Sequence, residues 1–131
     1  MAGKPLLTDR RQAIPVQVGT VSSPPTAGAP GVELSLGLSP QSLAFQKAQG
    51  RHVDRVEMIG ALFGPGGKFV TGEEALLDMD ISKETLANLI RSGLHITVTL
   101  RAPRGHYLLR FVLEDGGSGK LFATTLPAAV P

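Results

Sequence analysis

The chain has 131 residues, a length that suits one domain with a single hydrophobic core. Sixteen glycines and ten prolines make up about a fifth of the chain and charged residues only 18%, so the composition favours many turns and argues against a helical bundle. The formal net charge is +2 and the basic residues are scattered, so no binding of nucleic acid is expected. The absence of cysteine excludes disulfides, thiolate metal sites and cysteine nucleophiles.

The sequence also predicts the bounds of the folded domain and its relation to the membrane. No apolar run approaches the ~20 residues that a membrane-spanning helix needs, so no membrane insertion is expected. The first eleven residues carry positive charges but no apolar segment follows them, so these residues are not expected to be a signal peptide. We expect residues 1–13 to be a flexible N-terminal segment and residues 14–131 to be a single domain. Residues 22–31, rich in proline and glycine, are expected to form a loop or linker.

Alternation of apolar and polar residues predicts four strands before residue 82. These strands lie at residues 14–18, 32–39, 53–63 and 75–81. Pro15 confines the first strand to the edge of a sheet, because proline cannot donate to a central ladder. The glycine-rich turn at residues 64–68 leads into Phe69 and Val70, so the third and fourth strands are expected to form a hairpin.

After residue 81 the apolar period changes from two to 3.6, which predicts one short helix. Ser82 suits the N-cap, Ile81 and Leu86 suit a hydrophobic staple, and Gly93 can end the helix in the left-handed conformation. Three further strands are expected at residues 94–101, 106–114 and 120–126, the last ending before Pro127. The predicted fold class is therefore all-β: a seven-stranded antiparallel sandwich, immunoglobulin-like or fibronectin-III-like, with one short crossover helix.

No group of residues has the spacing of a catalytic or metal site. The glycine–lysine pairs at residues 66–68 and 117–120 lack the remaining positions of a phosphate loop. The three histidines, at positions 52, 95 and 106, are not spaced as metal ligands, and His95 is expected to be exposed. Asp78 and Asp80 share a strand face on which weak calcium binding is conceivable, but a solvated outer face is favoured. We therefore expect no enzyme, no cofactor and no bound metal.

The penultimate strand carries two features that point to structure and to a partner. Gly105 stands two residues before Tyr107, a spacing that resembles the tyrosine corner of immunoglobulin-like sandwiches, in which the hydroxyl bonds to nearby backbone; an ordinary core tyrosine is the alternative. Apolar residues also fall on the outward face of this strand and of its predicted neighbour. The candidate interface consists of Ile59, Phe63, Leu108, Arg110 and Val112. The helix or the N-terminal segment could instead cover this face.

Three stretches of the chain resemble a known family. Residues 62–63 running into 67–72, residues 84–89 and residues 102–110 are similar to the C-terminal β-sandwich region of bacterial proteins called VWFA-related, found widely in acidobacteria. The von Willebrand factor A domain itself is not matched, because residues 80–84 fail the last position of its Asp-x-Ser-x-Ser motif. The resemblance implies an accessory module that is secreted or periplasmic, with an A-type domain or a second copy as partner.

Two functions remain open at this point. A non-catalytic interaction or spacer module is favoured, because no catalytic group is visible. A carbohydrate-binding or small-ligand-binding sandwich is the alternative. Aromatic platforms for such a ligand are scarce, since the chain has no tryptophan and a single tyrosine.

Overall fold

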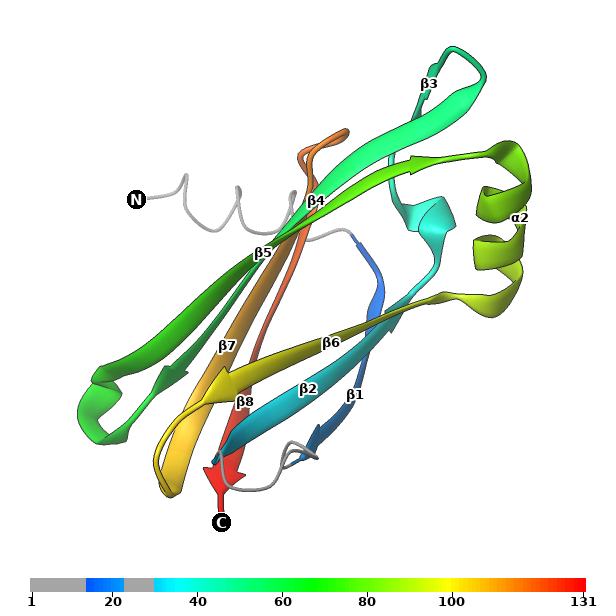
Figure 1. Ribbon diagram of the computed structural model, residues 1–131. Helices are drawn as coiled ribbons and strands as arrows, with labels where there is room; N and C mark the ends of the chain where they lie inside the picture. Colours follow the sequence, from blue (N-terminus) through cyan, green and yellow to red (C-terminus); the bar gives the residue numbers. More distant parts are fainter. Residues whose placement is uncertain (1–13, 23–29) are drawn as a thin grey trace.

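Two antiparallel sheets form the fold of the described residues, 14–22 and 30–131, in this computed structural model (Figure 1). The smaller sheet has the strand order β1 (Val16–Ser22), β2 (Gly31–Leu38) and β6 (Leu94–Arg101). The larger sheet contains β5 (Phe69–Ile81), β4 (Arg51–Phe63), β7 (Gly105–Asp115) and β8 (Leu121–Val130), each paired with the next, and the short strand β3 (Gln46–Ala48). The architecture is therefore all-β and sandwich-like, as predicted.

The predicted count of seven strands is not confirmed, because the described residues form eight. The additional strand is β3, which pairs with the first residues of β4 through a tight turn. Gln49 and Gly50 have positive φ angles of 53° and 77° in this turn. All three residues of β3 are exposed, so the strand has no apolar face that a sequence pattern could reveal.

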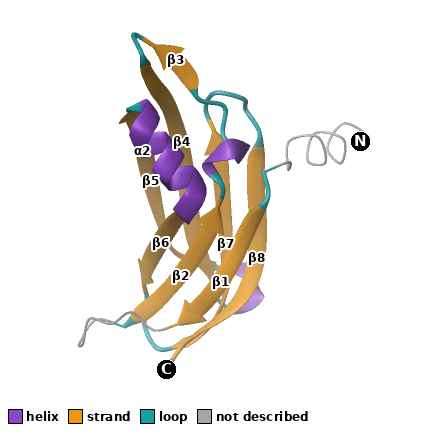
Figure 2. Cartoon of the chain, turned by 90° about the vertical axis from the view of Figure 1, so that its right-hand side faces the viewer, coloured by secondary structure: helices purple, strands orange, loops and turns teal. Residues whose placement is uncertain are grey.

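Helix α2 (Lys83–Ser92) carries the chain from the larger sheet to the smaller one and lies at one end of the molecule (Figure 2). Its capping agrees with the prediction. The Ser82 side chain accepts a hydrogen bond from the Thr85 amide at 3.1 Å, and Gly93 follows the helix with φ 83°. A short 3-10 helix, η1 (Pro40–Ser42), packs near α2, and a second, η2 (Pro65–Gly67), closes the β4–β5 hairpin. No helix in the described residues is long and apolar enough to cross a membrane.

The core fills the space between the sheets. Every second residue of β2, β4 and β7 points inward, as the alternation of each strand predicts. The most deeply buried side chains include Val32, Leu34, Val56, Leu62, Leu100, Leu109, Phe111 and Leu113. Because both sheets bury one face here, their outer faces are left for solvent or for partners.

Several predicted boundaries are wrong. The first strand is β1, Val16–Ser22, instead of residues 14–18, and β5 begins at Phe69 instead of residue 75. The last strand was expected to end before Pro127, but β8 continues to Val130 and pairs Pro127 with Leu108. Among the described strands β8 pairs only with β7, so it lies at the edge of the sheet, where a residue without an N–H is tolerated. Ala128 and Val130 are buried, which explains why the chain continues along the sheet.

Tyr107 ties the β6–β7 turn to the start of β7. Its hydroxyl donates a hydrogen bond to the carbonyl oxygen of Pro103, the kind of main-chain contact that the Gly105–Tyr107 spacing predicts. The ring is half-buried rather than buried and lies beside Gly105, whose φ of 158° is uncommon for residues with a side chain. The bond therefore holds a turn that glycine makes possible.

Replacing Tyr107 with Phe removes this hydrogen bond and little else. We expect the free energy of unfolding to fall by about 0.5 to 1.5 kcal/mol, the net worth of one hydrogen bond. Urea denaturation measures the change. A loss indistinguishable from zero would show that the contact with Pro103 does not stabilise the turn.

Candidate functional site

The predicted interface residues come together on the outer face of the larger sheet. The β4–β7 register pairs Ile59 with Val112 and Phe63 with Leu108, and Arg110 follows Leu108 on the same face of β7. Ile59 and Leu108 are each 49% exposed, Arg110 is exposed, and Phe63 and Val112 are half-buried. Neither α2 nor any other described segment covers the two most exposed side chains. Residues 1–13, the other predicted cover, lie outside the described residues.

Strand β5 adds an apolar residue to this face that the sequence analysis missed. Leu76 is 52% exposed and pairs with Glu57, next to the pair formed by Glu74 and Ile59. The signal was present, because Leu76 has the same parity as Asp78 and therefore had to point away from the core. We call Ile59, Phe63, Leu76, Leu108 and Val112, together with Arg110, the outer face.

Two of the four acidic residues of β5 are paired with arginines on β4. The Arg55 side chain donates to Asp78 at 3.0 Å, and the Arg51 side chain donates to Asp80 at 2.6 Å. Both carboxylates are exposed, in agreement with a solvated face. Within the described residues no cluster of three or more His, Asp or Glu side chains could hold a metal ion. Each of these two carboxylates is therefore already paired with a cation of its own chain.

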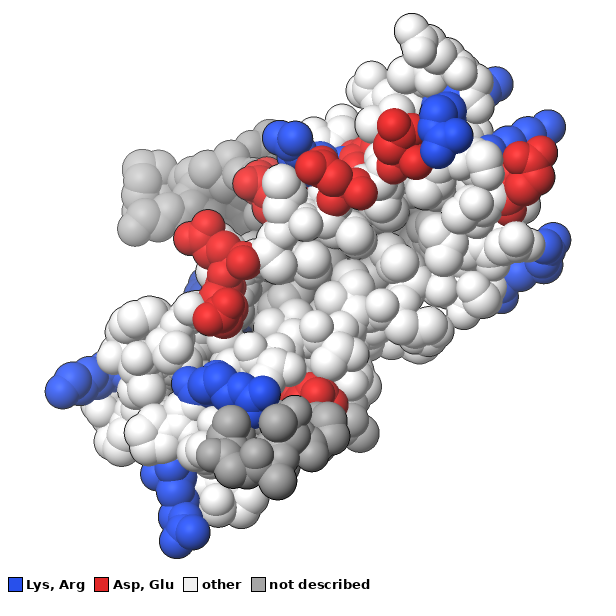
Figure 3. All heavy atoms as spheres, in the orientation of Figure 1, with Lys and Arg blue, Asp and Glu red and all other residues white. Residues whose placement is uncertain are grey.

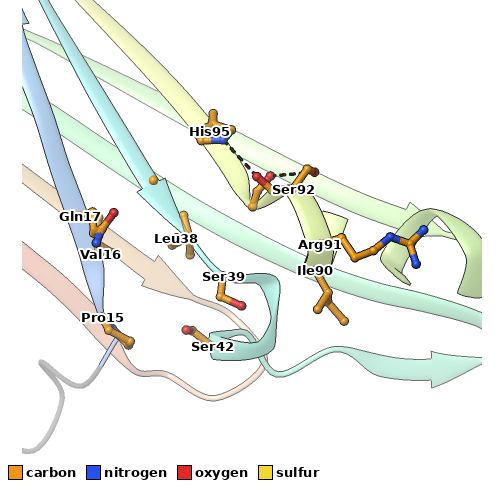
Figure 4. A pocket seen from close by; sticks show the side chains of 12 residues that line it. Pro15, Val16, Gln17, Leu38, Ser39, Ser42, Ile90, Arg91, Ser92 and His95 are labelled. Atoms are coloured by element: carbon orange, nitrogen blue, oxygen red, sulfur yellow. Dashed lines mark hydrogen bonds between the residues drawn. The ribbon is translucent and has the colours of Figure 1, made fainter. Parts of the chain in front are cut away.

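A pocket of about 560 Å³ lies where the smaller sheet meets α2 (Figure 4). Val16, Leu38 and Ile90 supply apolar surface, while Arg91 and His95 supply polar groups. His95 is exposed as predicted. Its Nε2 lies 3.3 Å from the Ser92 carbonyl oxygen. His52 and His106 stand on β4 and β7, so the fold assembles no histidine site among the described residues.

Two buried carboxylates lie at one end of the core, between β4 and the turn after β7. Asp54 is 6% exposed and Asp115 is fully buried. Oδ1 of Asp54 accepts hydrogen bonds from the amides of Arg55, at 2.9 Å, and Gly117, at 3.2 Å. No N–H or O–H of the described residues is bonded to Oδ2, which leaves this buried oxygen available for a proton.

Asp115 is surrounded by donors. Its Oδ2 accepts a hydrogen bond from the Ala44 amide at 3.0 Å and a second from the Ser118 hydroxyl at 2.6 Å. The Gly117 amide also lies 3.4 Å from Oδ1 of Asp115. A side chain on Gly117 would collide with the carbonyl oxygen of Ala44, so glycine is needed for the turn to approach this closely. The pair thus joins β4, the segment before β3 and the β7–β8 turn.

The two carboxyl groups share one proton. Burial, and after it the hydrogen bond to Asp115, raise the pKa of Asp54 from 3.8 to about 7. Burial also acts on Asp115, but the hydrogen bonds that it accepts, first from Asp54 and then from Ser118, outweigh burial and lower its pKa. We conclude that Asp54 is the protonated partner and donates to the Asp115 carboxylate, because two buried like charges cannot both remain ionised.

Sequence reasoning missed this pair, although a signal was available. Asp54 has the same parity as Val56 and Met58 on β4, and Asp115 has the same parity as Phe111 and Leu113 on β7. Both carboxylates were therefore placed on inward faces. They are too buried to meet a substrate, so the geometry assigns them a structural role.

Comparison with protein-family models gives no match, and comparison with curated proteins gives none either. The site must therefore be interpreted from its own residues.

The shared proton makes stability depend on pH. Because the pKa of Asp54 is raised in the folded state, its contribution is complete below its ordinary value of 3.8 and is lost as the pH rises through about 7. Because the pKa of Asp115 is lowered, its contribution is present above its ordinary value of 3.8 and is lost as the pH falls through the folded value. The free energy of unfolding should therefore be largest near pH 4 and should decrease progressively as the pH rises toward about 7.

The variant Asp54→Asn tests this assignment, because asparagine keeps the shape and offers an N–H to Asp115 without titrating. We expect Asp54→Asn to be more stable than the wild type at about pH 8, by about 1 to 3 kcal/mol, and to lose the decline between about pH 5 and pH 8. Urea denaturation across this range measures both effects.

The control is Asp78→Asn, which removes an exposed ion pair and should leave the shape of the pH profile unchanged. An unchanged pH profile in Asp54→Asn would contradict the shared proton.

Proposed function

We propose that the chain is a non-catalytic interaction and spacer module that uses the outer face of its larger sheet to dock a protein partner. One observation carries the proposal: apolar side chains of three adjacent strands are exposed on the same face of the sheet. Leu76, Ile59 and Leu108 are each about half exposed, and the register brings Val112 next to Ile59. Contiguous exposed apolar surface is typical of interfaces, whereas single exposed apolar residues are common everywhere.

The finer fold assignment is part of this proposal. We place the chain among immunoglobulin-like and fibronectin-III-like sandwiches. The order β4, β7, β8 corresponds to strands C, F and G of that architecture, with β5 beside the C strand, and β1, β2, β6 correspond to A, B and E. The bond from Tyr107 to Pro103 at the start of the penultimate strand supports the same assignment.

The cellular context of the proposal comes from the resemblance to VWFA-related bacterial proteins. In that context the module is secreted or periplasmic, and its partner is an A-type domain or a second copy of the module. The sandwich-like architecture is compatible with this role, and its outer face offers a surface for such a partner. Spacer modules need only a stable fold and one docking surface, so no catalytic group is required.

A small-ligand-binding module is the second candidate, and the pocket beside α2 is the observation that favours it. Arg91, Ser92 and His95 could hydrogen-bond a polar ligand there (Figure 4). No Phe, Tyr or Trp ring lines this pocket, so it lacks the large aromatic platform that carbohydrate sites use. A glycan array probed with the purified chain distinguishes the two candidates, because an interaction module should bind no glycan.

The variant Val112→Lys tests the docking surface. If the outer face meets a partner, Val112→Lys should keep its melting temperature at low protein concentration but lose self-association or docking to an upstream domain. Sedimentation velocity over a range of concentrations measures self-association.

Thr97→Lys, on the outward side of the smaller sheet, is the matched control and should leave association unchanged. A loss of several kcal/mol of stability in Val112→Lys would mean that the lysine is buried within the same chain, and the docking surface would then be wrong.

A further inference from the structure

Strand β5 presents a long free edge. It is hydrogen-bonded to β4 on one side, and no described strand pairs with its other side. The strand has thirteen residues, of which most are exposed. A free edge of this length displays a row of backbone N–H and C=O groups, which is a template for another extended chain.

The usual protective features of edge strands are missing from β5. The strand contains no proline, and its pairing with β4 is regular from Thr71 to Ile81 without a bulge. Exposed Phe69, Val70 and Leu76 lie along it. Charge is the remaining protection: Asp78 and Asp80 are paired with arginines of β4, but Glu73 and Glu74 have no ion-pair partner among the described residues.

This charge pattern disfavours a second copy as the occupant. In an antiparallel pair of two β5 strands centred on Glu74, the Glu74 side chains of the two copies would face each other on the same side of the sheet. Opposed like charges destabilise a strand pair. Figure 3 shows acidic side chains along the β4–β5 hairpin, with basic side chains beside some of them. A segment with a basic residue opposite Glu74 meets no such repulsion.

A receptor for a basic side chain lies beside the edge. On the outer face, Ile59 pairs with Glu74 and Glu57 pairs with Leu76, so two carboxylates and two aliphatic side chains occupy alternate corners of a square. They line a depression of about 280 Å³. Among the described residues neither carboxylate has an ion-pair partner. The aliphatic stem of a lysine or arginine fits the apolar corners while its charge meets the carboxylates.

We infer that the free edge of β5 binds an extended, basic segment of a partner protein as an added β-strand. Main-chain hydrogen bonds to β5 supply the pairing, and a lysine or arginine on the outer side of the segment occupies the square of Glu57, Ile59, Glu74 and Leu76. The inference rests on the proposed interaction function and names the chemistry of the partner.

The experiment titrates the full chain with a capped peptide of alternating lysine and valine and measures binding by calorimetry. We expect saturable binding that weakens as salt is added. The same peptide N-methylated at every second residue keeps its charges but cannot complete a strand ladder, so it should not bind. A capped peptide of alternating glutamate and valine should not bind either, because its charges oppose those of β5.

Two variants locate the site. Glu74→Gln should weaken binding of the lysine peptide by about two- to five-fold, as expected for one exposed ion pair. Glu73→Gln is the matched control, because Glu73 stands next to Glu74 on the same strand, is exposed, and points to the other face. It should bind the lysine peptide as the wild type does.

Each failure has a separate meaning. Absence of binding by the lysine peptide overturns the inference, as does equal binding of the N-methylated peptide, which would mean that charge alone attracts it. Equal weakening by Glu73→Gln and Glu74→Gln also overturns it, because the square would then play no part. None of these outcomes depends on Val112, so the docking surface is tested separately by the association of Val112→Lys.

Discussion

The register of β4 against β7 determines both faces of the larger sheet. The same alignment that buries Leu62 beside Leu109 places Ile59 beside Val112 on the opposite side. A slip of one residue would exchange the two faces of one strand, and core side chains would meet water. The outer face therefore exists because the core requires this alignment, and any partner surface on it is fixed to the same precision as the core.

The buried carboxyl pair acts on this register from one end. Asp54 is bonded to the turn that follows β7, and the amide of Gly116 in that turn donates to the Arg55 carbonyl oxygen at 2.7 Å. In any other register the two carboxyl groups would be buried without these donors, which is costly in a nonpolar core. The pair thus acts mainly by destabilising misaligned sheets. One shared proton leaves a single negative charge in the pair, which lowers the cost of burying it.

An element could be predicted from the sequence when the interactions that stabilise it leave a local pattern of residues. Alternation predicted the strands around Leu34, Met58 and Phe111, and capping residues predicted α2, because these elements are stabilised by burial and local bonds that leave a pattern. Strand β3 and the end of β8 were missed, since pairing with a neighbouring strand, not local pattern, holds them in the sheet. The carboxyl pair was missed although Asp54 lies at an inward position of β4, because Asp115 borders a glycine-rich turn, where an exposed aspartate is ordinary.

The acidic character of β5 links solubility and recognition. A long exposed strand with apolar residues would pair with its own copies unless charge prevented it. Glu73 and Glu74, which have no ion-pair partner among the described residues, oppose such pairing in every copy of this chain. The same carboxylates cannot repel a basic segment. The same carboxylates therefore repel a second β5 strand and attract a basic one. A substitution that neutralises them would weaken binding of a basic segment and would also remove the protection against pairing between two copies of β5.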